Sequence, residues 1–134
     1  MKSLLDTHIF LWYITDDPRL RKSWRTAIQD TNNQVYLSVV SFWEIMVKYH
    51  LGKLDLPEPP ALYIPTQRLR HQIADLSLDE QSVAQLAKLP WLHRDPFDRM
   101  LMGQAIAHKL ILFTADETIR AYQVSDLTFS NQDD

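Results

Sequence analysis

The chain has 134 residues and a formal net charge of −3, and hydrophobic residues make up 46% of it. This length and apolar content predict a single folded domain spanning residues 1–134. The chain contains no cysteine, which excludes disulfides, zinc–thiolate sites, iron–sulfur clusters and thiol catalysis. Proteins that hold nucleic acid through phosphate contacts alone are usually basic. A nucleic-acid substrate would therefore need another source of positive charge here, such as a bound cation.

In the first half of the chain, short apolar segments alternate with helical patterns. In order, the predicted elements are a strand at 3–7, a helix at 8–15, a helix opened by Asp17-Pro18 and closed by an Asn pair, a strand at 35–41 and a helix stopped by Gly52. The amino-terminal run MKSLLDTHIFLWYITDDP is too short and too polar to span a membrane, and it lacks the small-residue cleavage site of a signal peptide. We therefore expect a cytoplasmic protein with no membrane partner.

The second half continues the alternation after a proline-rich loop. The predicted elements are a helix at 61–71, a strand at 73–76, a helix at 78–89, a helix from Asp95-Pro96 to about Lys109, a strand at 110–114, a short helix in ADETIRAY and a weak strand at 127–129. Short apolar strands that alternate with helices are typical of an α/β sandwich. The sequence therefore predicts a mostly parallel sheet of four or five strands.

Four acidic residues fall where a parallel sheet places its functional groups, at the carboxyl ends of its strands. Asp6 ends the first strand, Glu44 lies in the first turn of the helix after the second strand, and Asp116 follows the fourth strand. The helix that contains Asp98 leads into the fourth strand. It must run antiparallel to that strand, so its start lies at the same edge of the sheet. We therefore expect the four side chains to converge.

A cluster of carboxylates needs a neutralising charge, because close negative charges raise one another's pKa. Ligand sets made only of oxygen favour Mg²⁺ or Mn²⁺. One or two such ions can lower the pKa of a bound water, orient it for attack on a phosphodiester and stabilise the leaving oxygen. The four acids thus predict a metal site for phosphodiester hydrolysis, and the ion would supply the positive charge that the composition lacks.

Each acid also has a purely structural interpretation. Residues 41–44 fit the capping-box pattern S-x-x-E, and residues 95–98 fit an N-cap aspartate followed by proline and an acid in the first turn. Asp6 and Asp116 could each cap the helix that follows. Capping explains the joint placement less well, because Ser, Thr or Asn would serve at most of these positions, whereas all four residues are acidic.

Four segments carry a resemblance to a known family, namely LLDTHIFLW, LSVVSFWEIMVKYHLGKL, HRDPFDRMLMGQA and FTADETI. Together they resemble PIN-domain ribonucleases, in particular the VapC-type toxins of prokaryotic toxin–antitoxin pairs. The resemblance implies a three-layer α/β/α sandwich, dependence on Mg²⁺ or Mn²⁺, and cleavage of RNA. By motif it implies that the catalytic and metal-binding acids are Asp6, Glu44, Asp98 and Asp116, with Asp95 as the capping acid of DPFDR.

Residues next to these acids have two interpretations each. Thr7 and Thr114 could hydrogen-bond metal-bound water, but turn capping explains them as well. Arg99 could bind a substrate phosphate or pair with Asp95, since its forked guanidinium suits both.

Two histidines and three basic residues are weaker candidates. His8 and His93 flank the site and could act as a general base. We favour a packing role for both, because a metal makes a histidine base unnecessary. Lys48, Lys53 and Arg94 are candidates for guiding RNA.

The resemblance also implies protein partners, an antitoxin that covers the acidic site and commonly a second copy in a homodimer. Many large side chains fall on short predicted helices; they are Trp12, Tyr13, Trp43, Tyr49 and Leu51. We expect most of them in the core and some in a groove for a partner helix.

The sequence therefore predicts a Mg²⁺-dependent endoribonuclease that is the toxin of a toxin–antitoxin pair. One alternative is a non-catalytic binding module with the same fold. A phosphotransfer or phosphatase domain on a similar sheet is less favoured. A haloacid-dehalogenase-like enzyme would need D-x-D at the first strand, where this chain has Asp6-Thr7-His8, and a phospho-receiver would need an acceptor Asp at the end of the third strand and a Lys after the last strand but one. The identity of the RNA that is cut is not determined by the sequence.

Overall fold

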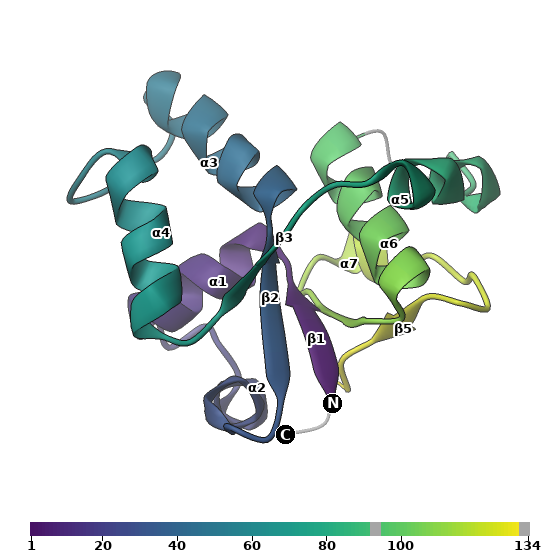
Figure 1. Ribbon diagram of the computed structural model, residues 1–134, viewed down its shortest axis with the longest axis horizontal. Coiled ribbons are helices and arrows are strands. Elements are labelled where there is room, and N and C mark those ends of the chain that lie inside the picture. The colour runs from purple at the N-terminus through teal and green to yellow at the C-terminus, as the bar shows by residue number, and fades with distance from the viewer. Residues whose placement is uncertain (92–94, 132–134) are drawn as a thin grey trace.

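The structure is a computed structural model that describes residues 1–91 and 95–131. Its centre is a five-stranded sheet in the order β3-β2-β1-β4-β5, in which every neighbouring pair of strands is parallel (Figure 1). The strands are β1 (Lys2–Leu5), β2 (Gln34–Ser38), β3 (Ala74–Leu76), β4 (Ile111–Phe113) and β5 (Thr128–Phe129). The predicted α/β class and parallel sheet are confirmed.

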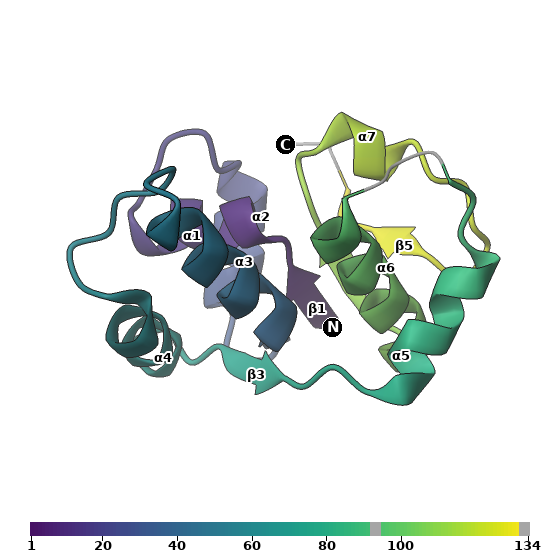
Figure 2. The ribbon, with the colours of Figure 1, turned by 90° about the horizontal axis from the view of Figure 1, so that it is seen from above.

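Helices form the two outer layers. They are α1 (Thr7–Ile14), α2 (Lys22–Gln29), α3 (Val39–His50), α4 (Pro60–Arg70), α5 (Glu80–Ala84), the 3-10 helix η1 (Gln85–Lys88), α6 (Pro96–His108) and α7 (Glu117–Arg120). Helices α1 to α4 group on one side of β1, and α5 to α7 group on the other (Figure 2). This is the three-layer arrangement that the resemblance implies. Within the described residues, no helix combines the length and the apolar character needed to cross a membrane.

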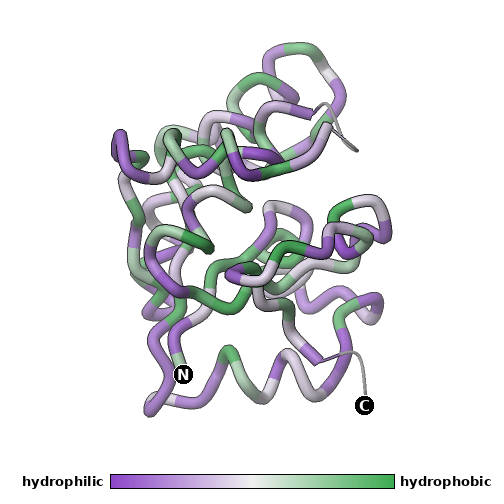
Figure 3. The backbone as a smooth tube through the Cα atoms, turned by 90° about the vertical axis from the view of Figure 1, so that its right-hand side faces the viewer, coloured by the Kyte–Doolittle hydropathy of each residue, from purple (hydrophilic) through white to green (hydrophobic). Residues whose placement is uncertain are grey.

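Two hydrophobic clusters hold the three layers together. Strands β1 and β4 contribute to both clusters, because successive side chains of a strand point to opposite faces of the sheet. Leu5 and Phe113 are buried with residues of α1, α2 and α4, whereas Leu4 and Leu112 are buried with residues of α6 and α7. Hydrophobic and hydrophilic residues alternate along the helices (Figure 3), as expected when only one side of a helix packs on a sheet.

Helix α3 begins three residues earlier than the sequence predicts. Its first residue is Val39, and the hydroxyl of the N-cap Ser38 accepts an N–H group of the first turn at 2.9 Å. The predicted strand 35–41 is therefore too long. The capping-box interpretation of Ser41 with Glu44 is wrong, because both residues lie inside the helix. The β-branched valines at the helix start favoured a strand, but the serine cap and the tertiary packing outweigh that preference.

Two other predicted helices differ in extent. Asp17 does not open α2, because its carboxylate accepts the N–H of Arg19 (2.9 Å) in a preceding turn and the helix starts at Lys22. The predicted helix 78–89 is two short pieces, α5 and η1, and Asp79 caps the first of them.

Gly103 lies where α6 packs closely on α5. A Cβ atom added at Gly103 would lie 2.5 Å from the carbonyl oxygen of Ser82, which a backbone atom cannot tolerate without moving. We expect Gly103→Ala to destabilise the protein by about 1–3 kcal/mol through overpacking, although alanine favours a helix by about 1 kcal/mol over glycine. Urea unfolding would measure the change, and an alanine variant more stable than the wild type would contradict it.

Candidate functional site

A cavity of about 320 Å³ lies beyond the ends of β1 and β4. Its lining includes Asp6, Glu44, Asp98 and Asp116, and also Asp95. The structure therefore brings to one cavity all four acids that the sequence places at this edge of the sheet, and it adds the carboxylate of the α6 cap.

The topology of the sheet explains this convergence. Asp6 follows β1 and Asp116 follows β4, and these two strands are parallel neighbours. Glu44 lies on α3, which starts directly after β2, the other neighbour of β1. Asp98 lies in the first turn of α6, the helix that returns the chain to the start of β4. The strands all run in the same direction, so their carboxyl ends lie at one edge of the sheet. The four positions share that edge.

Asp6 is buried, at 3% exposed, and both of its carboxylate oxygens are hydrogen-bonded. One oxygen accepts the N–H of Thr7 and the other accepts the hydroxyl of Thr114, each at 2.7 Å. Burial raises the pKa of the Asp6 carboxyl above its ordinary value; His8 and the two hydrogen bonds lower it, and the Glu44 carboxylate raises it again. A positive charge bound nearby would stabilise the ionised form.

Glu44 connects two walls of the cavity. Its Oε1 accepts a hydrogen bond from the hydroxyl of Thr7 at 2.6 Å, and its Oε2 accepts one from the ammonium of Lys48 at 2.6 Å. The Ser41 hydroxyl lies 2.9 Å from that of Thr7. Ser41 was missed as a site residue because its spacing fitted a helix cap. The same three-residue spacing also places it on the helix face that Glu44 occupies.

Two carboxylates lie at the amino terminus of α6. Asp95 is the N-cap, as predicted, and its carboxylate accepts the N–H groups of Phe97 (2.9 Å) and Asp98 (3.3 Å). Asp98 is only 8% exposed. The helix macrodipole favours negative charge at this end of the helix.

Thr114 joins the ends of β1 and β4. Besides donating to Asp6, its hydroxyl accepts the N–H of Asp116 at 3.1 Å. Asp116 in turn caps α7, and its carboxylate accepts the N–H of Thr118 at 2.8 Å. The capping interpretation of Asp116 is therefore correct, and the same side chain also lines the cavity.

His8 has both ring nitrogens engaged. Nε2 accepts the N–H of Ala115 at 3.2 Å, and Nδ1 lies 3.4 Å from Oδ2 of Asp6. Because Nε2 accepts a hydrogen bond, Nδ1 is the ring nitrogen that can donate, and it faces Asp6. These contacts support the packing role over a general base. His93 and Arg94 lie outside the described residues.

Arg99 is buried, at 3% exposed. Its guanidinium donates to the backbone oxygen of Pro90 (2.9 Å), to two further backbone oxygens in and next to η1, and to the hydroxyl of Tyr122 (3.2 Å). The ring of Trp91 covers it, with 4.0 Å from the guanidinium carbon to the ring centroid. These contacts support a structural role that fixes the η1 segment on α6. A contact of Arg99 with substrate or with Asp95 stays a prediction.

The chemistry of the lining fits a hard divalent cation. All five acidic side chains offer oxygen ligands, and the raised pKa of Asp6 expresses the cost of leaving its charge uncompensated. In the described parts of the chain, no three Asp, Glu or His side chains stand close enough to enclose an ion. Binding a cation would therefore require these side chains to turn toward it, and Glu44 would have to loosen its contact with Lys48.

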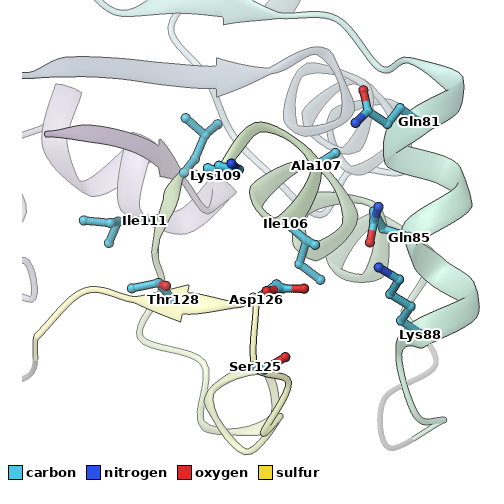
Figure 4. Close-up of a pocket in the computed structure, with 11 residues that line it drawn as sticks. Gln81, Gln85, Lys88, Ile106, Ala107, Lys109, Ile111, Ser125, Asp126 and Thr128 are labelled. Carbon is cyan, nitrogen blue, oxygen red and sulfur yellow. The ribbon is translucent and has the colours of Figure 1, made fainter.

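A second cavity, of about 460 Å³, lies near the starts of β4 and β5 (Figure 4). Its walls come from α5, η1, the end of α6 and the start of β5. Its charged lining residues are Lys88, Lys109 and Asp126. Because this larger cavity has a single carboxylate among its described lining residues, it lacks the acid cluster. Lys88 and Asp126 line this second cavity and not the cavity of the four acids, so they are suitable control positions for mutation.

An acid-lined cavity at the carboxyl ends of a parallel, helix-covered sheet defines a class of α/β protein suited to metal-assisted chemistry. Comparison with known families matches residues 3–124 to the PIN domain. The chain therefore belongs to the PIN domain family.

Two curated relatives come from Mycobacterium tuberculosis (strain ATCC 25618 / H37Rv). Ribonuclease VapC16 is 43% identical over 60 residues, which are 45% of this chain and 43% of that protein. The match thus spans less than half of the length of VapC16. Ribonuclease VapC22 is 24% identical over 121 residues, which are 90% of this chain and 91% of that protein.

Solved structures show the same fold. One is VapBC2 from Rickettsia felis bound to a DNA fragment from their promoter, with a TM-score of 0.72 and 18% identity over 99% of this chain and 100% of that one. Another is DNA-bound VapBC from Salmonella typhimurium, with a TM-score of 0.68 and 17% identity over 97% of each chain.

Proposed function

We propose that residues 1–134 form one domain that acts as a Mg²⁺- or Mn²⁺-dependent endoribonuclease, the toxin of a toxin–antitoxin pair. The observation that carries the proposal is the arrival of Asp6, Glu44, Asp98 and Asp116 in one cavity. Membership of the PIN family and two relatives named as ribonucleases support RNA as the substrate.

The four acids would hold the cation and are the catalytic residues of the proposal. A divalent ion bound by them supplies a Lewis acid that acidifies water and neutralises charge on the reacting phosphate. The protein supplies orientation. Thr7 fixes Glu44, and Thr114 fixes Asp6, each through a buried hydrogen bond. Asp95 holds the helix start in place so that Asp98 faces the cavity.

The first test is cleavage of purified cellular RNA by the purified protein. We expect cleavage with Mg²⁺ or Mn²⁺, loss of cleavage when a chelator removes the ion, and recovery when Mg²⁺ is added back. Gel analysis of end-labelled RNA would report the cut sites. Equal cleavage with and without chelator would contradict the metal role, and binding of RNA without cleavage would favour a non-catalytic binding module.

The proposed protein partner is an antitoxin, and a homodimer is proposed as the form of the toxin. The structural neighbours are described as VapBC assemblies, and α3 and α4 leave large apolar side chains exposed. They include Trp43 (51% exposed), Leu51 (62%), Leu62 (57%) and Leu69 (81%). Tyr13, by contrast, is in the core. An exposed apolar surface of this kind suits a helix from a partner.

Co-expression tests this partner. We expect the chain to arrest growth when expressed alone, and the product of a neighbouring small open reading frame to bind it and restore growth. Growth arrest that no neighbouring product relieves would contradict the antitoxin, while cleavage of RNA would still stand on its own.

A further inference from the structure

The carboxyl end of α3 presents two lysines to the acid-lined cavity. Leu51 is the C-cap, and Gly52 follows it with a φ of 72°. The N–H of Gly52 donates to the carbonyl of Tyr49 (3.1 Å), and the N–H of Lys53 donates to the carbonyl of Lys48 (2.9 Å). This pair of bonds is the Schellman motif. It reverses the chain and brings the backbone of Lys53 back against that of Lys48.

These lysines differ in charge from the rest of the ionisable lining. Among the lining residues that the structure describes, Lys48 and Lys53 carry the ammonium groups, and the other ionisable side chains are His8 and five carboxylic acids. Lys48 is half exposed, and its Nζ lies 2.6 Å from Oε2 of Glu44. The ammonium of Lys48 therefore contacts an acid of α3, and it lines the same cavity as Asp95 and Asp98 at the start of α6.

Lys53 needs a different explanation from Lys48. A lysine in the last turn of a helix that pairs with a glutamate four residues earlier is explained by helix stability alone. Lys53 lies beyond the helix, is exposed, and makes no ion pair within the described residues. Its charge lines the acidic cavity without a structural partner there. In a protein with a net charge of −3, such a charge suits an anionic ligand.

We infer that Lys48 and Lys53 form a phosphate clamp that binds the RNA backbone next to the phosphate that is cut. The inference rests on the proposed ribonuclease function and names two substrate-binding residues for it. Lysine binds phosphate as a point charge on a flexible stem, so the clamp holds the backbone without reading the base sequence. With a cation bound by the four acids, Lys48 would exchange its contact with Glu44 for the phosphate.

The expected result follows from counterion release. Each phosphate contact to a single strand contributes a slope of about −0.7 to log K against log salt. Between salt concentrations of about 1 M and about 0.1 M, one such contact strengthens binding roughly fivefold. Loss of the contact therefore lowers the affinity at about 0.1 M salt by roughly that factor. We expect Lys53→Met to raise KM for RNA by about fivefold and to reduce the salt slope by about 0.7, with kcat within about twofold of the wild type.

Three further variants make the test specific. Lys53→Arg keeps the charge and should restore KM. Gly52→Ala keeps both lysines but places a Cβ at a positive φ, and it should raise KM by loosening the turn. Lys88→Met removes the same charge at the second cavity (Figure 4) and should leave both KM and the salt slope unchanged. Circular dichroism and thermal melting would show that each variant is folded.

Cleavage of end-labelled RNA by the full chain gives kcat and KM. Fluorescence anisotropy with a labelled oligouridylate, in an Asp98→Asn background, gives the salt slope without cleavage. Wild-type protein that cuts no RNA with Mg²⁺ would defeat the proposed function. Wild-type cleavage with an unchanged KM and slope for Lys53→Met would defeat the clamp alone. A Lys53→Met variant that loses only antitoxin affinity would assign the lysines to the protein partner, which also overturns the clamp.

Discussion

Replacing Asp98 by asparagine is expected to reduce RNA cleavage by at least about 100-fold and to leave the fold intact. Groups that only orient a metal ligand cost about 10–100-fold when mutated, so a direct ligand should cost more. Asparagine has nearly the shape of aspartate, and the cap of α6 is made by Asp95, so the helix should keep its start. The loss of a favourable charge at the helix amino terminus costs about 0.3–1 kcal/mol.

The measurement is single-turnover cleavage at saturating enzyme, which separates chemistry from binding. Asp126→Asn is the matched control, because it makes the same change in the second cavity. We expect the control to cut RNA at the wild-type rate. Cleavage by Asp98→Asn within about tenfold of the wild type would show that the four acids do not act together, since a direct ligand should cost more than that.

Replacing Asp6 by asparagine is expected to abolish cleavage and at the same time to stabilise the protein in the presence of a chelator. The Asp6 carboxyl is buried, and burial with the nearby Glu44 charge raises its pKa against the opposing effect of His8 and two hydrogen bonds. Removing the charge should raise the free energy of unfolding at neutral pH by about 0.5–2 kcal/mol, the usual gain from a single stabilising substitution. Asparagine retains the ability to cap α1.

The pH dependence has a definite sign. In the unfolded chain the Asp6 carboxyl has an ordinary pKa of about 3.9, whereas the pKa in the folded protein is higher. Above the folded pKa, both states are ionised and the folded state carries the full cost of the buried charge. As the pH falls through the folded pKa, the folded protein takes up the proton first and regains that stability. The advantage of Asp6→Asn should therefore be largest at neutral pH and shrink on acidification.

Urea unfolding of wild type and variant at a series of pH values would show this, with chelator present throughout. Added Mg²⁺ should stabilise the wild type and have little effect on Asp6→Asn, because only the ionised site binds the ion. An advantage that stays constant from neutral to acidic pH would mean that the buried charge of Asp6 is not its cause.

Local patterns predicted the order of the strands and the position of the acids at one edge of the sheet, because hydrophobic periodicity depends on neighbouring residues. The position of Asp98 needed one additional rule, that a helix leading into a parallel strand runs antiparallel to it, and the structure agrees. The predicted start of α3 was wrong because Ser38 and Ser41 are both residues that suit a helix cap. In the structure, Ser38 makes the capping hydrogen bond and α3 begins at Val39.

The sequence by itself determined the order of strands and helices, the excess of acids at strand ends and the family motifs, since these depend on residue type and spacing. The tertiary structure decided which contacts each side chain makes across long separations in the chain. It buried Arg99 under Trp91, fitted Gly103 against α5, and placed Lys53 at the rim of the acid cavity through the turn at Gly52. Such contacts depend on how the folded elements pack against one another. The spacing of the residues in the sequence does not reveal them.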